Sequence, residues 1–301
     1  MNFDNLINSL SELKIEYIKD EPMSRHTTFK IGGNADVLVK VKSNDELIHV
    51  LSLAKKFEIP YFVLGKGSNL LVSDKGIDGI VISLDGLDSI SINGNTVLCG
   101  AGVSLRSVCL AVQTASLSGL EFGYGIPGTV GGALYMNAGA YGGEMSQVTV
   151  SATAVDKDGN KVELSLADMQ LGYRTSVFKN SGLIITDVTF KLNEGNANEI
   201  KAAMDDFFGR RRDKQPLEYP SAGSTFKRPE GYFAGALIEQ NNLKGVSVGG
   251  AQVSEKHAGF VINTGSATCD DVLSLIKKVQ DVVKTADGVT LEPEVIFVGR
   301  K

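Results

Sequence analysis

The sequence of 301 residues has few of the side chains that build disulfide frameworks or metal centres. Its cysteines and histidines are Cys99, Cys109, Cys269, His26, His49 and His257. The cysteines are odd in number, widely spaced and never paired as Cys-x-x-Cys, which is typical of reduced thiols that act as small core hydrophobes. The histidines lie far apart and lack the spacing of metal ligands. We therefore expect no disulfide and no metal site.

An excess of basic residues and a long apolar run are also missing. The formal net charge is −5, whereas a protein held by nucleic-acid phosphates needs a clustered basic surface. No segment offers the ~18 consecutive apolar residues of a membrane helix, and residues 1–14 lack a basic stretch that leads into an apolar run. We therefore expect no nucleic-acid partner, no membrane insertion and a cytoplasmic location. No obligate protein partner is indicated.

What is present is the composition of an ordinary globular protein. Hydrophobic residues make up 43% and charged residues 22% of the chain, so a sizeable core can form without disulfides. One hydrophobic core stops growing at roughly 250 to 300 residues, where chains begin to divide into domains. Two or three domains are therefore expected.

Helix and strand signals divide the chain into three α+β units. Ser43 and Glu46 have capping-box spacing before a helical pattern over 44–58, between strand patterns at 35–41 and 61–64. Further strands are predicted at 79–84, at 88–102 on either side of the turn Asn93-Gly94-Asn95, and at 148–155, 183–192 and 291–298. Further helices are predicted from Ser104 to near Gly119, from Asn196 to the break at Gln215-Pro216, and from Thr268 to Gly288. We place the units at 1–84, 85–193 and 194–288.

The strand predicted at 61–64 runs directly into the segment Gly65-Lys66-Gly67-Ser68-Asn69-Leu70. Turns of this kind can direct successive backbone N–H groups at an anion. Glycine permits close backbone approach to a diphosphate, and the Ser68 hydroxyl and Asn69 amide add hydrogen-bonding groups. Taken alone, a plain strand-to-strand turn explains this segment at least as well.

A denser glycine cluster lies between Gly119 and Gly143, where nine of the 34 glycines fall. Apolar residues such as Ile126, Val130 and Leu134 are interleaved with these glycines and can anchor the segment in a core. Because glycine loses the most conformational freedom on ordering, we infer that ordered backbone lines a ligand here. The first cluster has Leu70 where a Rossmann site has its third glycine, and the second does not place the Gly-x-Gly-x-x-Gly spacing at a strand–helix junction, so a standard dinucleotide half-fold is disfavoured.

Six segments, in order along the chain, resemble the MurB family of UDP-N-acetylenolpyruvoylglucosamine reductases. They cover residues 25–33 (RHTTFKIGG), 65–74, 125–143, 173–179 (YRTSVFK), 222–227 (AGSTFK) and 291–295 (LEPEV). The resemblance spans nearly the whole chain. It implies an α+β fold of the vanillyl-alcohol-oxidase (PCMH) type, with FAD-binding subdomains at 1–84 and 85–193 and a C-terminal α+β substrate-binding domain at 194–288. Strand 289–301 would return to the flavin site.

The resemblance also implies a cofactor, a co-substrate and a reaction. NADPH would reduce non-covalently bound FAD, and the flavin would then reduce UDP-N-acetylglucosamine enolpyruvate. Hydride would reach the enolpyruvyl methylene carbon and give UDP-N-acetylmuramate, a peptidoglycan precursor. This is a conjugate addition that pushes charge into the carboxylate, so the protein must stabilise an enolate-like species and supply a proton.

Three residues match the catalytic positions of the family. Ser224 would donate the proton, and the charged fork of Arg174 suits a carboxylate that gains charge. Glu294, if protonated in a closed site, would donate a hydrogen bond to the enolate and have a raised pKa. Glu292 lies two residues away on the same predicted strand, so spacing alone does not choose between the two acids. The family places its acid directly before valine, which favours Glu294.

Further contacts are implied by the same resemblance. Flavin contacts are expected at Gly65, Lys66, Gly67, Ser68, Asn69, Leu70, Gly125, Ile126, Pro127, Gly128, Thr129, Gly132, Asn137, Gly139 and Ala140. Substrate contacts are expected at Lys227, Arg228, Tyr232, Arg211 and Lys214. Neighbouring arginines on a helix point ~100° apart, so Arg210, Arg211 and Arg212 do not form one phosphate patch. Residues 179–182 lead straight into the next strand, as in the short-loop form that lacks a substrate-covering tyrosine loop.

Two other functions stay open. An oxidase of the same fold would be suggested by a histidine or cysteine that links the flavin covalently, but His26, the only histidine near the flavin segments, belongs to a family segment. A flavin- or nucleotide-binding sensor is the non-enzymatic alternative. It would be favoured by loss of Ser224, Arg174 and Glu294, and all three are present.

Overall fold

The computed structural model describes residues 3–300 as two compact units, each built from segments that alternate along the chain. The first unit comprises residues 3–18, 37–66 and 79–210, and the second comprises residues 19–36, 67–78 and 211–300. Each unit has its own hydrophobic core. The division into three domains at residues 84 and 193 stays a prediction.

One sheet has the strand order β1-β2-β5-β3. Its strands are β1 (Glu16–Pro22), β2 (Asn34–Lys40), β5 (Ile77–Ser83) and β3 (Tyr61–Leu64). Strand β3 runs parallel to β5, with Tyr61 opposite Ile80. Helix α2 (Asn44–Lys56) begins as predicted, because the Ser43 hydroxyl accepts a hydrogen bond from the backbone N–H of Glu46. Helix α1 (Phe3–Glu12) packs against α2.

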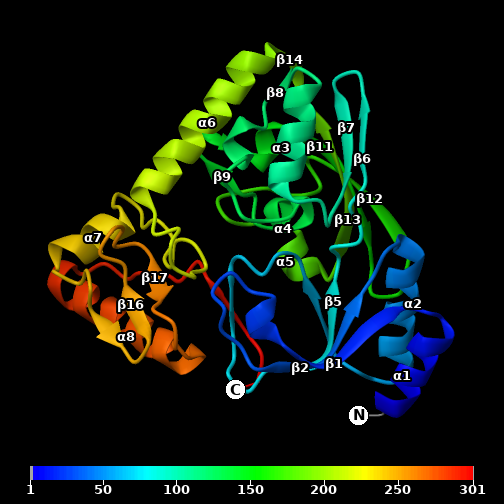
Figure 1. Ribbon diagram of the computed structural model, residues 1–301, viewed down its shortest axis with the longest axis horizontal. Coiled ribbons are helices and arrows are strands. Elements are labelled where there is room, and N and C mark those ends of the chain that lie inside the picture. The colour runs from blue at the N-terminus through cyan, green and yellow to red at the C-terminus, as the bar shows by residue number, and fades with distance from the viewer. Residues whose placement is uncertain (1–2, 301) are drawn as a thin grey trace. The chain divides into compact units, whose positions relative to one another are not determined.

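The second sheet of the first unit is antiparallel, with the order β12-β11-β13-β7-β6 (Figure 1). Its strands are β12 (Lys161–Ser165), β11 (Thr149–Val155), β13 (Ile184–Lys191), β7 (Thr96–Gly100) and β6 (Ile90–Asn93). Gly94, with φ of 55°, helps form the predicted turn between β6 and β7. Helix α4 (Val130–Tyr135) packs against β13 and β7. The glycine cluster is therefore anchored on this sheet.

One predicted helix is shorter than expected. Helix α3 (Leu105–Thr114) begins after its Ser104 cap, but it ends five residues before Gly119. The chain leaves the helix because Ser116 has a φ of 57° and because β8 (Leu117–Ser118) pairs with β14 (Asn193–Glu194). The remaining elements of this unit are β9 (Gly139–Ala140), β10 (Gly143–Glu144), α5 (Phe178–Ser181), the 3₁₀ turns η2 (Glu121–Gly123) and η3 (Met145–Gln147), and most of α6 (Ala197–Lys214).

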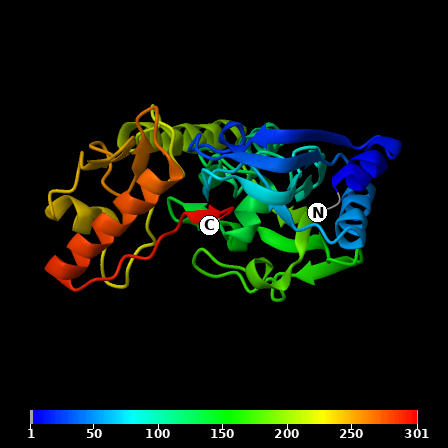
Figure 2. The same ribbon diagram turned by 90° about the horizontal axis from the view of Figure 1, so that it is seen from below.

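The second unit contains a small antiparallel sheet covered by a long helix. The sheet has the order β15-β16-β17, with β15 (Ser247–Val248), β16 (Ala251–Val253) and β17 (Val261–Asn263). Helix α8 (Cys269–Asp287) packs against β15, β16 and α7 (Ala234–Gln240). The predicted capping box of Thr268 and Asp271 is present, and Gly288 ends α8 with a φ of 70°. Figure 2 shows α8 as one continuous helix.

The C-terminal strand is also shorter than predicted. Strand β18 (Ile296–Val298) pairs in parallel with β4 (Leu70–Val72). Residues 291–295, which were expected to belong to it, lie outside the strand. They have a different partner, because Pro293 forms an isolated antiparallel bridge with Phe226. The chain therefore changes partner close to Val295. A 3₁₀ turn, η1 (Met23–Arg25), also belongs to this unit.

The three cysteines are core residues, as predicted. Cys99, Cys109 and Cys269 are buried, and burial raises the pKa of each thiol to about 12. They therefore stay protonated at neutral pH and pack as small apolar groups. In the described part of the chain, no helix is both long enough and apolar enough to cross a membrane.

Asp74, at the end of the first family glycine segment, caps helix α8. Its two carboxylate oxygens accept hydrogen bonds from the backbone N–H groups of Cys269, at 2.8 Å, and Asp270, at 3.2 Å. We expect Asp74→Ala to lower the free energy of unfolding of the second unit by ~0.5 to 2 kcal/mol, as for other lost caps. Urea unfolding would measure this change. Asp74→Asn should lose less, because it keeps one oxygen acceptor, and equal losses would contradict the capping role.

Candidate functional site

In the first unit, Gly65 lies directly against the start of helix α4. A Cβ atom at Gly65 would lie 2.8 Å from the hydroxyl oxygen of Thr129. Thr129 is buried, and the same oxygen accepts a hydrogen bond from the backbone N–H of Gly132 at 3.2 Å. The hydroxyl therefore cannot move aside without losing the helix cap. A glycine is required at 65, and Thr129, predicted to contact the flavin, caps α4 with its side chain.

The glycines of the second cluster have two different roles. Gly131 and Gly143 are packing positions, because a Cβ atom there would overlap Ala101 or Phe122. By contrast, Gly132 is exposed and Gly125 and Gly128 are half-buried, so their backbone is accessible and carries no side chain. This open backbone fits a flat ligand with a diphosphate, such as FAD, because donors and carbonyls can approach the ligand closely.

Asn137 joins the glycine cluster to the loop that carries Arg174. Its side chain is buried, accepts a hydrogen bond from the Ser146 N–H at 2.9 Å and donates one to the Gly172 carbonyl at 3.1 Å. Both ends of the amide are thus engaged within the protein. Any flavin contact by Asn137 would therefore come mainly from its backbone.

Arg174 lies beside the predicted flavin residue Gly139. One terminal guanidinium nitrogen donates a hydrogen bond to the Gly139 carbonyl at 3.3 Å. Arg174 has a φ of 54°, in the left-handed region that residues other than glycine rarely adopt. The Lys179 ammonium holds this backbone by donating to the Arg174 carbonyl at 2.6 Å. The conformation of Arg174 is therefore determined by its surroundings.

In the second unit, Gly67 packs against the first family segment. Gly67 has a φ of 60°, and a Cβ atom there would overlap the carbonyl oxygen of His26. The Gly67 carbonyl accepts a hydrogen bond from the Thr28 N–H at 3.3 Å. Lys66, in the first unit, is exposed, and in the second unit Ser68 is half-buried whereas Leu70 is buried. The turn at Gly67 is thus held by its backbone contacts with His26 and Thr28.

Asn69 is bound to the segment that carries Glu294. Its side-chain amide donates a hydrogen bond to the Glu294 carbonyl at 3.1 Å, and its own carbonyl accepts one from the Ile296 N–H at 2.9 Å. The second bond belongs to the start of the β4–β18 pairing. Asn69, predicted as a flavin contact, therefore positions the backbone of the proposed acid.

The segment that follows Ser224 runs antiparallel to the segment that carries Glu294 within the second unit. The Thr225 carbonyl accepts a hydrogen bond from the Glu294 N–H at 2.8 Å, and the Glu292 carbonyl accepts one from the Lys227 N–H at 2.8 Å. Ser224 is exposed and follows Gly223, which has a φ of 76°. Glu294 is half-buried. A hydroxyl and a carboxyl group thus come from neighbouring antiparallel segments.

The two acids near the C-terminus have different environments. Glu292 is exposed, and its carboxylate lies 3.0 Å from the Lys227 ammonium. The expectation that both acids belong to the C-terminal strand was wrong, because their segment lies outside β18 and pairs with 225–227. The ion pair also shows that Lys227, a predicted substrate contact, has a protein partner.

The other predicted substrate residues lie at two places in the second unit. Arg211 and Lys214 are in the last turn of α6. Arg228 donates from Nε to the Tyr232 carbonyl at 3.3 Å and stacks over the Phe233 ring at 4.0 Å. Tyr232 and Phe233 are 48% and 62% exposed, so their rings can reach a ligand. Phe233 was not predicted, although its position next to Tyr232 is a usable signal.

Comparison with known proteins matches two parts of the chain to known domain families. A model of an FAD-binding domain matches residues 35–165, and a model of the C-terminal domain of UDP-N-acetylenolpyruvoylglucosamine reductase matches residues 215–298. The chain is 50% identical to the UDP-N-acetylenolpyruvoylglucosamine reductase of Caldanaerobacter subterraneus subsp. tengcongensis, covering 99% of this chain and 98% of the relative. The reductase of Clostridioides difficile is 49% identical and covers 99% of each chain.

Solved structures agree with these matches. The crystal structure of UDP-N-acetylenolpyruvylglucosamine reductase from Thermus caldophilus superposes with a TM-score of 0.81 at 36% identity, covering 94% of this chain and 98% of that one. Glucooligosaccharide oxidase from Acremonium strictum, at 13% identity and a TM-score of 0.52, covers 97% of this chain and 60% of its own and shares the fold alone. The predicted α+β flavoprotein fold is thereby confirmed. The chain belongs to the family of UDP-N-acetylenolpyruvoylglucosamine reductases and is an oxidoreductase with an FAD-binding domain.

Proposed function

We propose that this protein reduces UDP-N-acetylglucosamine enolpyruvate to UDP-N-acetylmuramate, using NADPH and non-covalently bound FAD. The names of the nearly full-length relatives support the substrate, and the match to an FAD-binding domain supports the cofactor. The observation that supports the proposal is the antiparallel pairing of 225–227, which directly follows Ser224, with 292–294, which ends on Glu294. A cytoplasmic location follows from the proposed role in precursor synthesis and belongs to the same proposal.

The reaction needs one hydride and one proton. Bound FAD, once reduced by NADPH, would supply the hydride to the enolpyruvyl methylene carbon. The electron pair of the double bond then moves onto the adjacent carbon and its carboxylate, and the Ser224 hydroxyl gives its proton to that carbon. Glu294, as a protonated acid, donates a hydrogen bond to the carboxylate while charge develops on it. The Ser224 oxygen is reprotonated from solvent, to which it is exposed.

The positive charge of Arg174 is complementary to the substrate carboxylate. Its guanidinium group would form a charge-assisted hydrogen bond with the substrate carboxylate, and this bond strengthens as the carboxylate gains charge. The left-handed backbone of Arg174 is held by Lys179, so the backbone conformation of Arg174 is fixed before any ligand binds. A strained residue of this kind costs roughly 1 to 3 kcal/mol and is concentrated at functional sites.

Substrate recognition is proposed for the second unit. Arg228 and Tyr232, with Lys227, come from the segment that follows Ser224, and Arg211 and Lys214 come from the end of α6. Arginine and lysine are the side chains that bind diphosphates, and an exposed tyrosine ring can stack on a uracil. The order of these contacts along the UDP group is part of the proposal.

Anaerobic spectroscopy tests this function directly. Purified protein should be yellow, NADPH should bleach the flavin absorbance, and the enolpyruvyl sugar nucleotide should restore it with formation of UDP-N-acetylmuramate. A flavin that is restored only by oxygen would indicate an oxidase of the same fold instead. A colourless protein that cannot be reconstituted with FAD would overturn the proposal altogether.

A further inference from the structure

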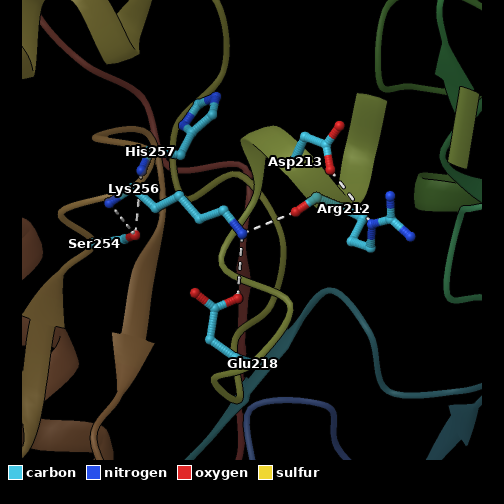
Figure 3. Close-up of polar contacts among 6 residues, drawn as sticks. All are labelled: Arg212, Asp213, Glu218, Ser254, Lys256 and His257. Atoms are coloured by element: carbon cyan, nitrogen blue, oxygen red, sulfur yellow. Dashed lines mark hydrogen bonds and ion pairs between the residues drawn. The ribbon is translucent and has the colours of Figure 1, made fainter. Parts of the chain in front are cut away.

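A turn beside the Ser224 segment is held rigidly at its beginning. We call residues 254–260 the histidine turn. Ser254 is 1% exposed, and its hydroxyl oxygen accepts hydrogen bonds from the N–H groups of Lys256 and His257, both at 3.2 Å (Figure 3). The Lys256 ammonium donates to the Arg212 carbonyl at the end of α6 at 2.8 Å and lies 3.4 Å from the Glu218 carboxylate. These contacts restrict the backbone on which His257 stands.

The ring of His257 accepts a hydrogen bond from its own turn. The backbone N–H of Gly259 donates to Nδ1 at 3.1 Å. Because a backbone N–H can only donate, Nδ1 must be unprotonated, and the neutral ring carries its proton on Nε2. The ring also packs edge-on against Phe260, with centroids 5.0 Å apart. A Cβ atom at Gly259 would lie 3.0 Å from Cε1 of this ring, so the turn closes tightly around it.

The same turn holds the residue after Ser224. The Gly259 carbonyl accepts a hydrogen bond from the Thr225 N–H at 2.8 Å, and the Val261 N–H donates to the Thr225 hydroxyl oxygen at 2.9 Å. Thr225 is buried, and its carbonyl is bonded to the Glu294 N–H. The N–H of Gly259 therefore contacts His257 while its carbonyl contacts the residue adjacent to Ser224.

We infer that His257 is a positioning residue for the Ser224 proton donor, and that it acts only while Nδ1 is unprotonated. Protonation would set the Nδ1–H against the Gly259 N–H, and two donors cannot share a hydrogen bond. The Ala258–Gly259 peptide, which carries this N–H, would have to rotate; the accompanying change in φ of Gly259 would shift the next peptide, whose carbonyl would leave Thr225. Ser224 would then lose its fixed direction. This inference rests on the proposed role of Ser224.

Burial of His257 favours the neutral ring. Burial is the largest influence and lowers the pKa of His257; a local backbone hydrogen bond raises it, the Lys244 ammonium lowers it and the Glu239 carboxylate raises it. Lys244 and Glu239 form an ion pair with each other at 2.8 Å, so their effects largely cancel. On the turn itself, Glu255 and Lys256 are exposed. The ring is therefore neutral near pH 7 and gains a proton below its ordinary pKa of ~6.5.

Two substitutions of His257 distinguish the effect of the Nδ1 acceptor from that of the rest of the ring. In His257→Asn the amide oxygen can take the position of Nδ1 and does not titrate, whereas His257→Gln places its amide near the position of Nε2. The measurement is the rate at which enolpyruvyl substrate reoxidises the dithionite-reduced enzyme, followed from pH 5 to 8. We expect the rate of the parent protein to decrease below pH 6.5, where His257 gains a proton. The rate of His257→Asn should stay within ~3-fold of the parent rate at pH 7.5 and should not decrease below pH 6.5. His257→Gln should be at least ~10-fold slower at every pH, with an unchanged KM.

Several outcomes would overturn the inference. Equal rates for the two variants would show that the acceptor position does not matter, and an acid-side decrease that persists in His257→Asn would assign it to another group. Nitrogen-15 NMR of the parent protein provides a measurement that needs no variant, and a protonated Nδ1 at pH 7.5 would refute the tautomer. The Ser224→Ala variant keeps the two proposals apart. If it reduces substrate at the parental rate, the proposed role of Ser224 fails, and the NMR result still reports on His257 alone.

Discussion

Replacing Ser224 with alanine is expected to slow reoxidation of the reduced flavin by the enolpyruvyl substrate by roughly 10²- to 10⁴-fold, the usual contribution of a general acid. Ser224 is exposed, and the carbonyl of its neighbour Thr225 accepts a hydrogen bond from the Glu294 N–H. The hydroxyl contributes no described hydrogen bond to the fold, so reduction of the flavin by NADPH should keep its parental rate. Stopped-flow absorbance, with each half-reaction started separately, measures both steps.

Ser221→Ala is the matched control for this experiment. Ser221 lies three residues earlier in the same segment, and its structural contact is a backbone carbonyl that accepts a hydrogen bond from the Thr28 hydroxyl at 2.7 Å. Alanine keeps that carbonyl, so both half-reactions should be unchanged. If Ser224→Ala slows both half-reactions equally, the serine is not the proton donor and its loss acts through the flavin site or the fold.

Replacing Gly67 with alanine is expected to destabilise the second unit and weaken FAD binding together. The new Cβ atom would overlap the His26 carbonyl oxygen, and the residue would need a φ of 60°. Overpacking of this kind costs roughly 1 to 3 kcal/mol, and a left-handed alanine costs roughly 1 to 2 kcal/mol more. Denaturant unfolding should therefore show a loss of about 2 to 5 kcal/mol. The purified variant should retain less flavin.

Gly94→Ala distinguishes the cost of the overlap with His26 from the cost of the left-handed backbone. Gly94 has a φ of 55°, close to that of Gly67, but no atom lies within 4 Å of the position its Cβ would take. This variant should lose only the roughly 1 to 2 kcal/mol of the left-handed conformation and should keep its flavin content. Equal losses at the two positions would show that the contact with His26 relaxes and that the turn is less constrained than the structure indicates.

Helix starts were predicted well because their signals are local. Ser43 before α2 and Thr268 before α8 cap their helices through bonds to residues three positions away. Element ends were predicted less well. Helix α3 stops early because Leu117 and Ser118 pair with residues 193–194, more than seventy positions along the chain. No pattern within a window of a few residues specifies such a partner, so tertiary pairing decides the boundary.

The sequence by itself determined the family, the two glycine clusters and the identity of the candidate catalytic residues, because these depend on residue types in a fixed order. Only the tertiary structure decided what surrounds them. It placed Glu292 in an ion pair with Lys227, directed the Asn69 amide to the Glu294 carbonyl and set the histidine turn against Thr225. These contacts join segments that lie tens to hundreds of residues apart. The two contacts to backbone carbonyls form because backbone groups that folding removes from water must find partners wherever the chain brings them together.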